Sequence, residues 1–221
     1  GAVPGSCARC HTADGLPMYL NEGVNISTPV ANGFQCTTCH ASLEDYSLRN
    51  DVEEDVMFPS GASVNSGDQA MNLCINCHQG RSSTTTVNGR IGDTPDDTVS
   101  DSLGFINIHY FAAGATIYGS EVQGGYEYAG KEYVGQFRHV PAISTCTGCH
   151  DTHQLTVKVE ECGACHPVVE SYDDLASIRV SSTDFDGDGD ATEGIAGEIG
   201  TMTALLYDAI QVYAEATDEV D

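Results

Sequence analysis

The chain has 221 residues, of which 33 are acidic and 8 are Lys or Arg, and its formal net charge is −25. This charge repels phosphate backbones and anionic lipid headgroups, which excludes nucleic acid and a membrane surface as partners held by charge. Only 40% of the residues are hydrophobic, 24 are Gly and none is Trp, so side chains alone predict a thin apolar core.

The N-terminal residues 1–11 lack the basic and apolar regions of a signal peptide, and we read Gly1 as the start of a mature or processed chain. The long uncharged stretch 102–120 contains His109 together with Asn107 and several Gly and Ser residues. We therefore expect no membrane span.

All ten cysteines lie in pentapeptides of the form Cys-x-x-Cys-His. The five motifs are Cys7–Cys10–His11, Cys36–Cys39–His40, Cys74–Cys77–His78, Cys146–Cys149–His150 and Cys162–Cys165–His166. Two thiols at this spacing reach the two vinyl groups on one edge of a haem, and the following His lies beneath the iron as its proximal ligand. Disulfides or zinc sites do not explain a His after every second Cys, and pairing the units into zinc sites leaves one over.

The motifs thus predict five covalently attached c-type haems, whose porphyrin faces fill the thin core. Attachment of this kind is made outside the cytoplasm, so we expect a secreted, extracellular protein, with the periplasm as the alternative. Around the first three motifs the chain is rich in Gly, Ser, Thr, Asn and Asp, which predicts loops and a short helical turn at each motif.

Further along the chain, residues 126–128 and 132–137 alternate around Ala129-Gly130 and predict a β-hairpin over 126–137. After the fifth motif, an acidic loop resembles the start of an EF-hand calcium loop, with oxygen ligands at alternate positions. Its candidate ligands are Asp184, Asp186, Asp188, Asp190 and Glu193. The twelfth position is Ile195, where a bidentate Glu belongs; Glu193 or Glu198 is a substitute, and a solvated acidic turn is the alternative.

Apolar residues then recur at intervals of three and four from Ile195, which predicts one amphipathic helix over about 195–216. The fold class expected overall is a mostly irregular multihaem cytochrome with short helices, this hairpin and this C-terminal helix. We expect a pentahaem domain over 1–180 wrapped around the haems, with the acidic loop and helix of 181–221 packed on it.

The eight histidines set a limit on axial ligation. Five are proximal, which leaves His109, His139 and His153 as candidate distal ligands. Exchange between identical subunits leaves the number of imidazoles per chain unchanged, so two irons need a Met, an open site, or a His from elsewhere. Met57, in an irregular segment between two motifs, and Met18 are the first Met candidates.

Several blocks of sequence resemble a family of secreted multihaem c-type cytochromes of bacteria and archaea. They are NLCINCHQGR, FINIHYFAAGATIYG, GGYEYAGKEYVGQFRHV, CTGCHDTHQLTVKVEECGACH and DFDGDGDATEGI. The resemblance implies distal ligation by His109, His139 and His153. Such proteins include subunits of extracellular cytochrome filaments, which implies self-association. Relatives often continue past the C-terminal helix, so a C-terminal piece missing from this sequence could carry the absent distal ligands.

The leading hypothesis is therefore electron transfer rather than catalysis, with other redox proteins or extracellular electron acceptors as partners. The alternatives are a monomeric electron shuttle, and a haem enzyme that reduces a small substrate at an open axial site.

Overall fold

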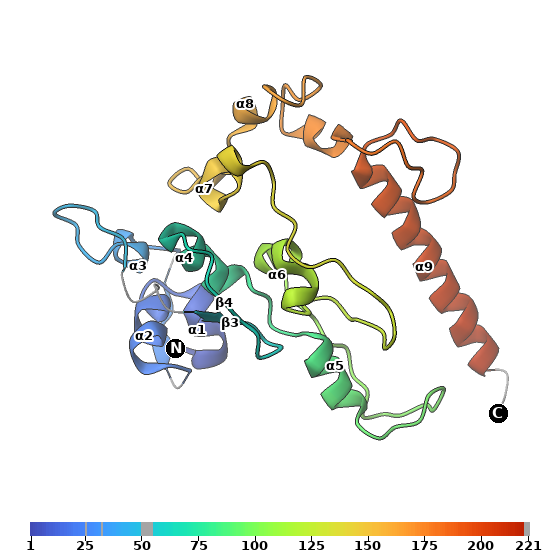
Figure 1. Cartoon of the computed structure of the whole chain (residues 1–221). Helices are drawn as coiled ribbons and strands as arrows, with labels where there is room; N and C mark the ends of the chain where they lie inside the picture. Colours follow the sequence, from blue (N-terminus) through green and yellow to red (C-terminus); the bar gives the residue numbers. More distant parts are fainter. Residues whose placement is uncertain (25, 32, 50–54, 219–221) are drawn as a thin grey trace. The chain divides into compact units, whose positions relative to one another are not determined.

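A computed structural model describes residues 1–24, 26–31, 33–49 and 55–218, and Figure 1 shows short helices joined by long irregular segments. The α-helices are α1 (Gly5–His11), α2 (Gly15–Glu22), α3 (Cys36–Cys39), α4 (Gln69–His78), α5 (Thr84–Ile91), α6 (Ala113–Tyr118), α7 (Cys146–Cys149), α8 (Val159–Cys162) and α9 (Ile195–Asp218). The described residues also include the short 3-10 helices η2 (Gly119–Glu121), η3 (Pro141–Ile143) and η4 (Asp173–Ser177). This arrangement confirms the expected fold class.

In the described part of the chain, the strands form three separate antiparallel pairs. In these pairs β1 (Ala2–Pro4) joins β2 (Ser27–Pro29), β3 (Val56–Met57) joins β4 (Ser63–Val64), and β5 (His150–Asp151) joins β6 (Thr156–Val157). Their registers pair Val3 with Thr28, Val56 with Val64, and His150 with Val157. Two-stranded sheets of this size fix local turns and cannot supply a core by themselves.

The chain divides into two compact units, Gly1–Gly148 and Cys149–Asp221. The division falls inside α7, so the fourth motif contributes one cysteine to each unit. This division differs in position from the boundary after residue 180, which was predicted to separate the haem-binding part of the chain from the acidic loop and its helix. The functional boundary at residue 180 stays a prediction.

Each motif folds as a helical turn, as expected. The first lies in α1, the second in α3, the third at the end of α4 and the fourth in α7. The fifth begins at Cys162, the last residue of α8, and the backbone N–H groups of Cys165 and His166 both donate to the Cys162 carbonyl. The helical turn brings the two cysteines of each motif toward one side of the chain.

The predicted hairpin over 126–137 is wrong as to its strands, although its turn forms. The Lys131 N–H donates to the Tyr128 carbonyl at 3.2 Å, but the next segment bonds to the end of α6 instead of to 126–128. Val134 accepts from the Ser120 N–H at 3.0 Å, and the Phe137 N–H donates to the Ile117 carbonyl at 3.1 Å. These bonds use the backbone groups that a hairpin ladder needs.

A glycine permits this approach. Gly119 has a φ of +52°, and a Cβ placed on it would lie 2.3 Å from the Val134 carbonyl oxygen. The alternating pattern of residues 132–137 therefore indicated an extended segment correctly. The segment to which it hydrogen-bonds, at the end of α6, was not identified from the sequence.

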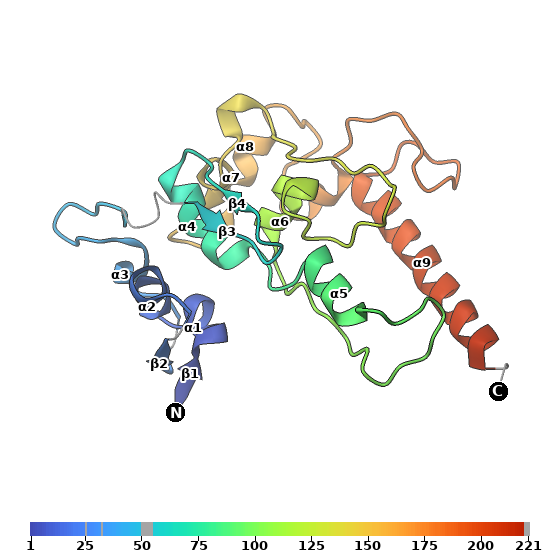
Figure 2. The same cartoon turned by 60° about the horizontal axis from the view of Figure 1, so that its bottom comes forward.

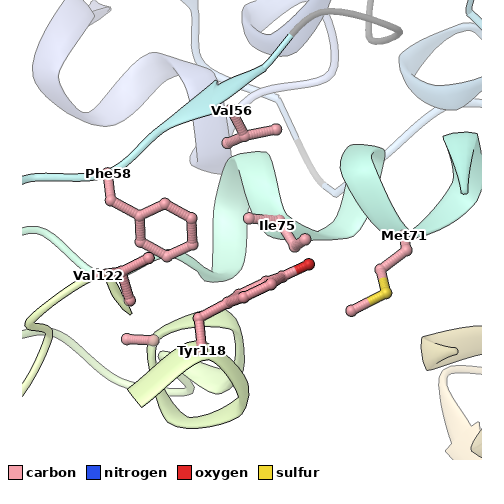
Figure 3. Close-up of a cluster of buried hydrophobic side chains, with 7 residues drawn as sticks. Val56, Phe58, Met71, Ile75, Tyr118 and Val122 are labelled. Carbon is pink, nitrogen blue, oxygen red and sulfur yellow. The ribbon is translucent and has the colours of Figure 1, made fainter. Parts of the chain in front are cut away.

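The main hydrophobic cluster lies between β3, α4 and α6 (Figure 3). Its buried members are Val56, Phe58, Met71, Ile75, Ala115, Tyr118 and Val122. Phe58 and Tyr118 meet edge to face with ring centroids 5.9 Å apart. A second cluster of Leu16 and Leu73 joins α2 to α4. Helix α4, which carries the third motif, is therefore the best-buried element of the first unit.

The second unit has almost no core made of side chains. Among its described residues, Val169 is the only buried hydrophobic side chain. Helix α9 begins at the predicted residue, directly after the acidic loop (Figure 2), and large apolar side chains along it are exposed, including Leu206 at 62%. Within the described part of the chain, no helix is both long enough and apolar enough to cross a bilayer.

The start of α4 offers a test of the fold around the third motif. The Asp68 carboxylate caps this helix by accepting the Met71 N–H at 2.7 Å. We expect Asp68→Ala to lower the free energy of unfolding by about 1 kcal/mol, because the cap acceptor is lost. Asp68→Asn keeps an acceptor and is the matched control. Denaturant titration measures both, and equal destabilisation by the two variants would contradict the capping role.

Candidate haem and cation sites

Two proximal histidines are held by backbone carbonyls. His40 Nδ1 lies 2.7 Å from the Tyr46 carbonyl oxygen, and His78 Nδ1 lies 2.7 Å from that of Phe111. A ring that donates from Nδ1 presents the lone pair of Nε2, which is the arrangement of a metal-bound imidazole with a fixed tautomer. The geometry of both side chains therefore fits an axial ligand of haem iron.

The residues that present these carbonyls are strained. Tyr46 has a φ of +55° and Phe111 a φ of +54°, a left-handed conformation that bulky residues seldom adopt and that clusters at functional sites. Sequence reasoning did not identify these two carbonyl groups, because nothing in the local pattern marks them.

Thiols from different motifs lie side by side in the first unit. Cys10 Sγ is 4.0 Å from the Cys77 carbonyl oxygen, and Cys77 Sγ is 3.8 Å from the Arg9 carbonyl oxygen. A hydrogen bond from the Cys77 thiol lowers the pKa of Cys10 to about 5, and the same contact raises the pKa of Cys77. The first and third motifs therefore meet at their second cysteines.

A second thiol pair joins the third motif to the fourth. Hydrogen bonding with Cys74 lowers the pKa of Cys146 to about 7, and Cys146 raises that of Cys74. Cys39 of the second motif is exposed, although burial of its thiol group raises its pKa. The third motif thus lies between attachment points of the first and the fourth.

Among the candidate distal ligands, His109 lies beside a proximal histidine. Its ring centroid lies 5.9 Å from that of His11, and the two planes are 83° apart. His139 is exposed in the first unit, and His153 is exposed in the turn between β5 and β6 of the second. The His153 N–H donates to Asp151 Oδ1 at 2.9 Å, which fixes this turn beside His150.

The two methionine candidates differ in setting. Met18 is half-buried on α2. Met57 is 61% exposed, and its segment is not irregular as expected, because residues 56–57 form β3 against β4. Both remain predictions as ligands.

The acidic loop folds around its own backbone. Asp184 accepts the N–H groups of Gly187 and Gly189, which lowers its pKa, and Asp190 accepts from Thr192. Carboxylate oxygens gather in two groups, each within 4.8 Å: Asp184, Asp186 and Asp188, and Asp186, Glu193 and Glu198. Four of the five predicted ligands are therefore in one of these groups, and Asp190 is in neither.

Glu198 on α9 anchors the loop. Its side chain is fully buried, pairs with Arg179 Nη1 at 2.6 Å, and accepts the N–H groups of Phe185 and Asp186. Burial raises its pKa, but the hydrogen bonds from Arg179 and the two backbone N–H groups outweigh that effect and the pKa is lowered. Sequence reasoning did not identify Arg179. It could have been recognised as a single basic residue that shortly precedes the acidic residues 184–193.

Glu193 has the opposite character. Burial, and then the negative charges of Asp186, Asp188, Glu198 and Asp190, raise its pKa. Its Oε1 and Asp186 Oδ2 are buried without a hydrogen-bond partner. Among the described residues of the loop, these two are the buried carboxylate oxygens that accept no hydrogen bond.

Comparison with known proteins finds distant relatives of the chain. The chain is 28% identical to the C-type polyheme cytochrome OmcC of Geobacter sulfurreducens, over 68% of this chain and 24% of that protein. This distant homology supports a multihaem c-type cytochrome family for the chain. The C-type polyheme cytochrome OmcB, from two strains of the same species, is also 28% identical to this cytochrome, over 67% of the chain.

This cytochrome is a distant homologue of these proteins, and it spans about a quarter of their length (24%). No protein-family model and no solved structure matches it. The shared family supports haem c as the cofactor, while the number of haems and their ligands depend on the residues described above.

Proposed function

We propose that the chain is an extracytoplasmic electron-transfer protein that carries five c-type haems. Haem c, when bound, supplies a reversible one-electron iron couple. The ten cysteines would hold the haems through thioether bonds. His11, His40, His78, His150 and His166 would be the proximal ligands, and His109, His139 and His153 the distal ones.

The observation that carries this proposal is the meeting of thiols across motifs. Thioether bonds form at one edge of the porphyrin, so thiols in contact bring edges of neighbouring haems together. The pairs Cys10 with Cys77 and Cys74 with Cys146 therefore support a run of haems from the first motif through the third to the fourth. An electron relay needs this closeness, and an isolated catalytic haem does not.

The polypeptide around these sites sets ligation and polarity. The carbonyls that accept from His40 and His78 increase the basicity of these ligands, which stabilises the oxidised iron. The Tyr118 hydroxyl is buried without a partner, and its pKa is raised chiefly by burial; it is a donor suited to a porphyrin carboxylate. Two irons have no distal His within the chain, with Met57 and Met18 as candidates.

Electron transfer is tested on the purified haem-loaded protein. We expect a mass increase of five haems, low-spin spectra for the bis-His irons, and rapid reduction of all haems by a single donor. Mass spectrometry, optical and magnetic spectra and stopped-flow reduction measure these. Turnover of nitrite, hydroxylamine or peroxide at a high-spin iron would contradict the carrier role and favour the enzyme alternative.

We further propose that the chain assembles into a filament through copies of itself, with other redox proteins or extracellular acceptors at its ends. The resemblance to filament subunits supports this, as does α9, which exposes Ile199, Leu206 and Ile210 along one side. Salt favours assembly because it screens the charge of −25.

Assembly predicts a concentration-dependent rise in sedimentation coefficient and filaments in electron micrographs. Leu206→Glu should abolish both, because it places a charge on the apolar side of α9. Gln211→Glu adds the same charge at an exposed polar position and should leave assembly intact. A wild-type chain that stays monomeric at all concentrations and salts would favour the monomeric shuttle.

We also propose that the acidic loop binds calcium or a similar hard cation, through Asp184, Asp186, Asp188 and Glu193, with Asp190 as a further ligand. The support is the pair of buried oxygens without donors. Without a cation, Glu193 stabilises the fold below its unfolded pKa of about 4.3, and this contribution is lost as the pH rises through the higher folded pKa.

Glu193→Gln should therefore raise the melting temperature of calcium-free protein at neutral pH, and should lower it in calcium, because a ligand is lost. Asp208→Asn, exposed on α9, is the control and should do neither. Thermal melts in chelator and in calcium measure both states, and a wild-type melting curve that calcium does not move would contradict the proposal.

A further inference from the structure

We propose that His109 is the sixth ligand of the iron attached at the first motif, opposite His11. The proposal depends on haem attachment at Cys7 and Cys10, as proposed above, and it assigns one distal histidine to one iron. The sequence alone does not assign His109 to the first iron, because three candidate distal histidines can be distributed over five irons in many ways.

The separation of the two rings fits a shared metal. A metal ion lies about 2 Å from each imidazole nitrogen that binds it, so two axial imidazoles place their ring centroids about 6 Å apart. The observed centroids of His11 and His109 are 5.9 Å apart. His11 is the last residue of α1, directly after the cysteines of its motif, so a haem attached there lies against this ring.

The backbone around His109 is fixed on both sides. Asn107 Oδ1 accepts the His109 N–H at 2.7 Å, and the Ile108 carbonyl accepts the Arg81 N–H at 2.8 Å. Gly80 has a φ of +83°, and a Cβ placed on it would lie only 3.1 Å from the Ile108 carbonyl oxygen. The absence of a side chain at Gly80 therefore permits the close approach of Ile108. These contacts hold the segment against the residues that follow the third motif.

His109 itself has a φ of +87°. A non-glycine residue in this region is strained, and such strain persists where the surroundings over-determine the conformation, as they do at functional sites. With this backbone conformation, the ring of His109 lies beside that of His11, which belongs to a motif far away in the sequence.

The same short segment also reaches the third motif. Two residues after His109, the Phe111 carbonyl accepts from His78 Nδ1 at 2.7 Å. Residues 107–111 would therefore ligate the first iron and orient the proximal ligand of the third. One piece of chain then fixes the axial ligation of two haems whose attachment thiols, Cys10 and Cys77, are in contact.

The test uses the haem-loaded protein and its spectra rather than electron-transfer rates. His109→Ala should convert one haem per chain from low-spin to high-spin, and that haem should bind carbon monoxide; added imidazole should restore the low-spin spectrum. Because the observed planes are 83° apart, the wild-type site should give a strongly anisotropic low-spin signal, and this signal should disappear.

The assignment to the first iron is tested in two backgrounds that each lack one haem. In Cys7→Ala/Cys10→Ala, the further change His109→Ala should add no high-spin haem. In Cys36→Ala/Cys39→Ala, which removes the second haem instead, it should still add one. A high-spin haem gained in the first background, or none gained in the wild-type chain, would overturn the pairing.

His109→Met is the second variant, for the case in which a haem-deficient background does not fold. It keeps the site six-coordinate and should raise the reduction potential of one haem while adding the charge-transfer band of a Met–iron bond. An unchanged redox titration would overturn the proposal. If haems are not attached at all, the mass of the wild-type protein shows it. That outcome contradicts the proposed function and is distinct from an incorrect pairing of His109 with the first iron.

Discussion

The contact between the first and third motifs is the constraint on which the larger unit depends. Helices α1 and α4 come together at Cys10 and Cys77, and α4 is also the helix that carries Met71 and Ile75 into the main hydrophobic cluster. The best-packed helix of the chain therefore also holds the central attachment motif. One element thus provides packing energy and carries the third motif, so a change that loosens α4 would also displace that motif.

This arrangement explains why so little apolar side chain is buried elsewhere. The first unit has one cluster and a small satellite, and the second unit buries Val169 alone among its described hydrophobic residues. Domains of this size ordinarily need a larger core or covalent cross-links to fold. Thioether bonds to a rigid, largely apolar group would supply both, and residues such as Phe105 and Phe111, now exposed, are apolar surface suited to a porphyrin face.

The parts of the fold that the sequence predicted are those set by local chemistry. The motif spacing predicted helical turns, and the apolar period predicted α9 from Ile195 onward. The hairpin over 126–137 was wrong because its backbone groups bond to Ser120 and Ile117, which are distant in pattern but near in space. The carbonyls of Tyr46 and Phe111, the Arg179–Glu198 pair and the approach of His109 to His11 are likewise tertiary, and periodicity carries no information about them.

The acidic loop shows how a cluster of like charges is tolerated in so acidic a chain. Backbone N–H groups neutralise Asp184 and Asp190, and Arg179 compensates Glu198 at the start of α9. Glu193 receives no such donor, and its pKa is raised, first by burial and then by its acidic neighbours. A cation bound beside this carboxyl would lower the cost of ionising it, and a bound proton removes the charge altogether. Because the loop leads directly into α9 and Glu198 of that helix anchors it, a cation bound by the loop as proposed would also stabilise the start of the helix.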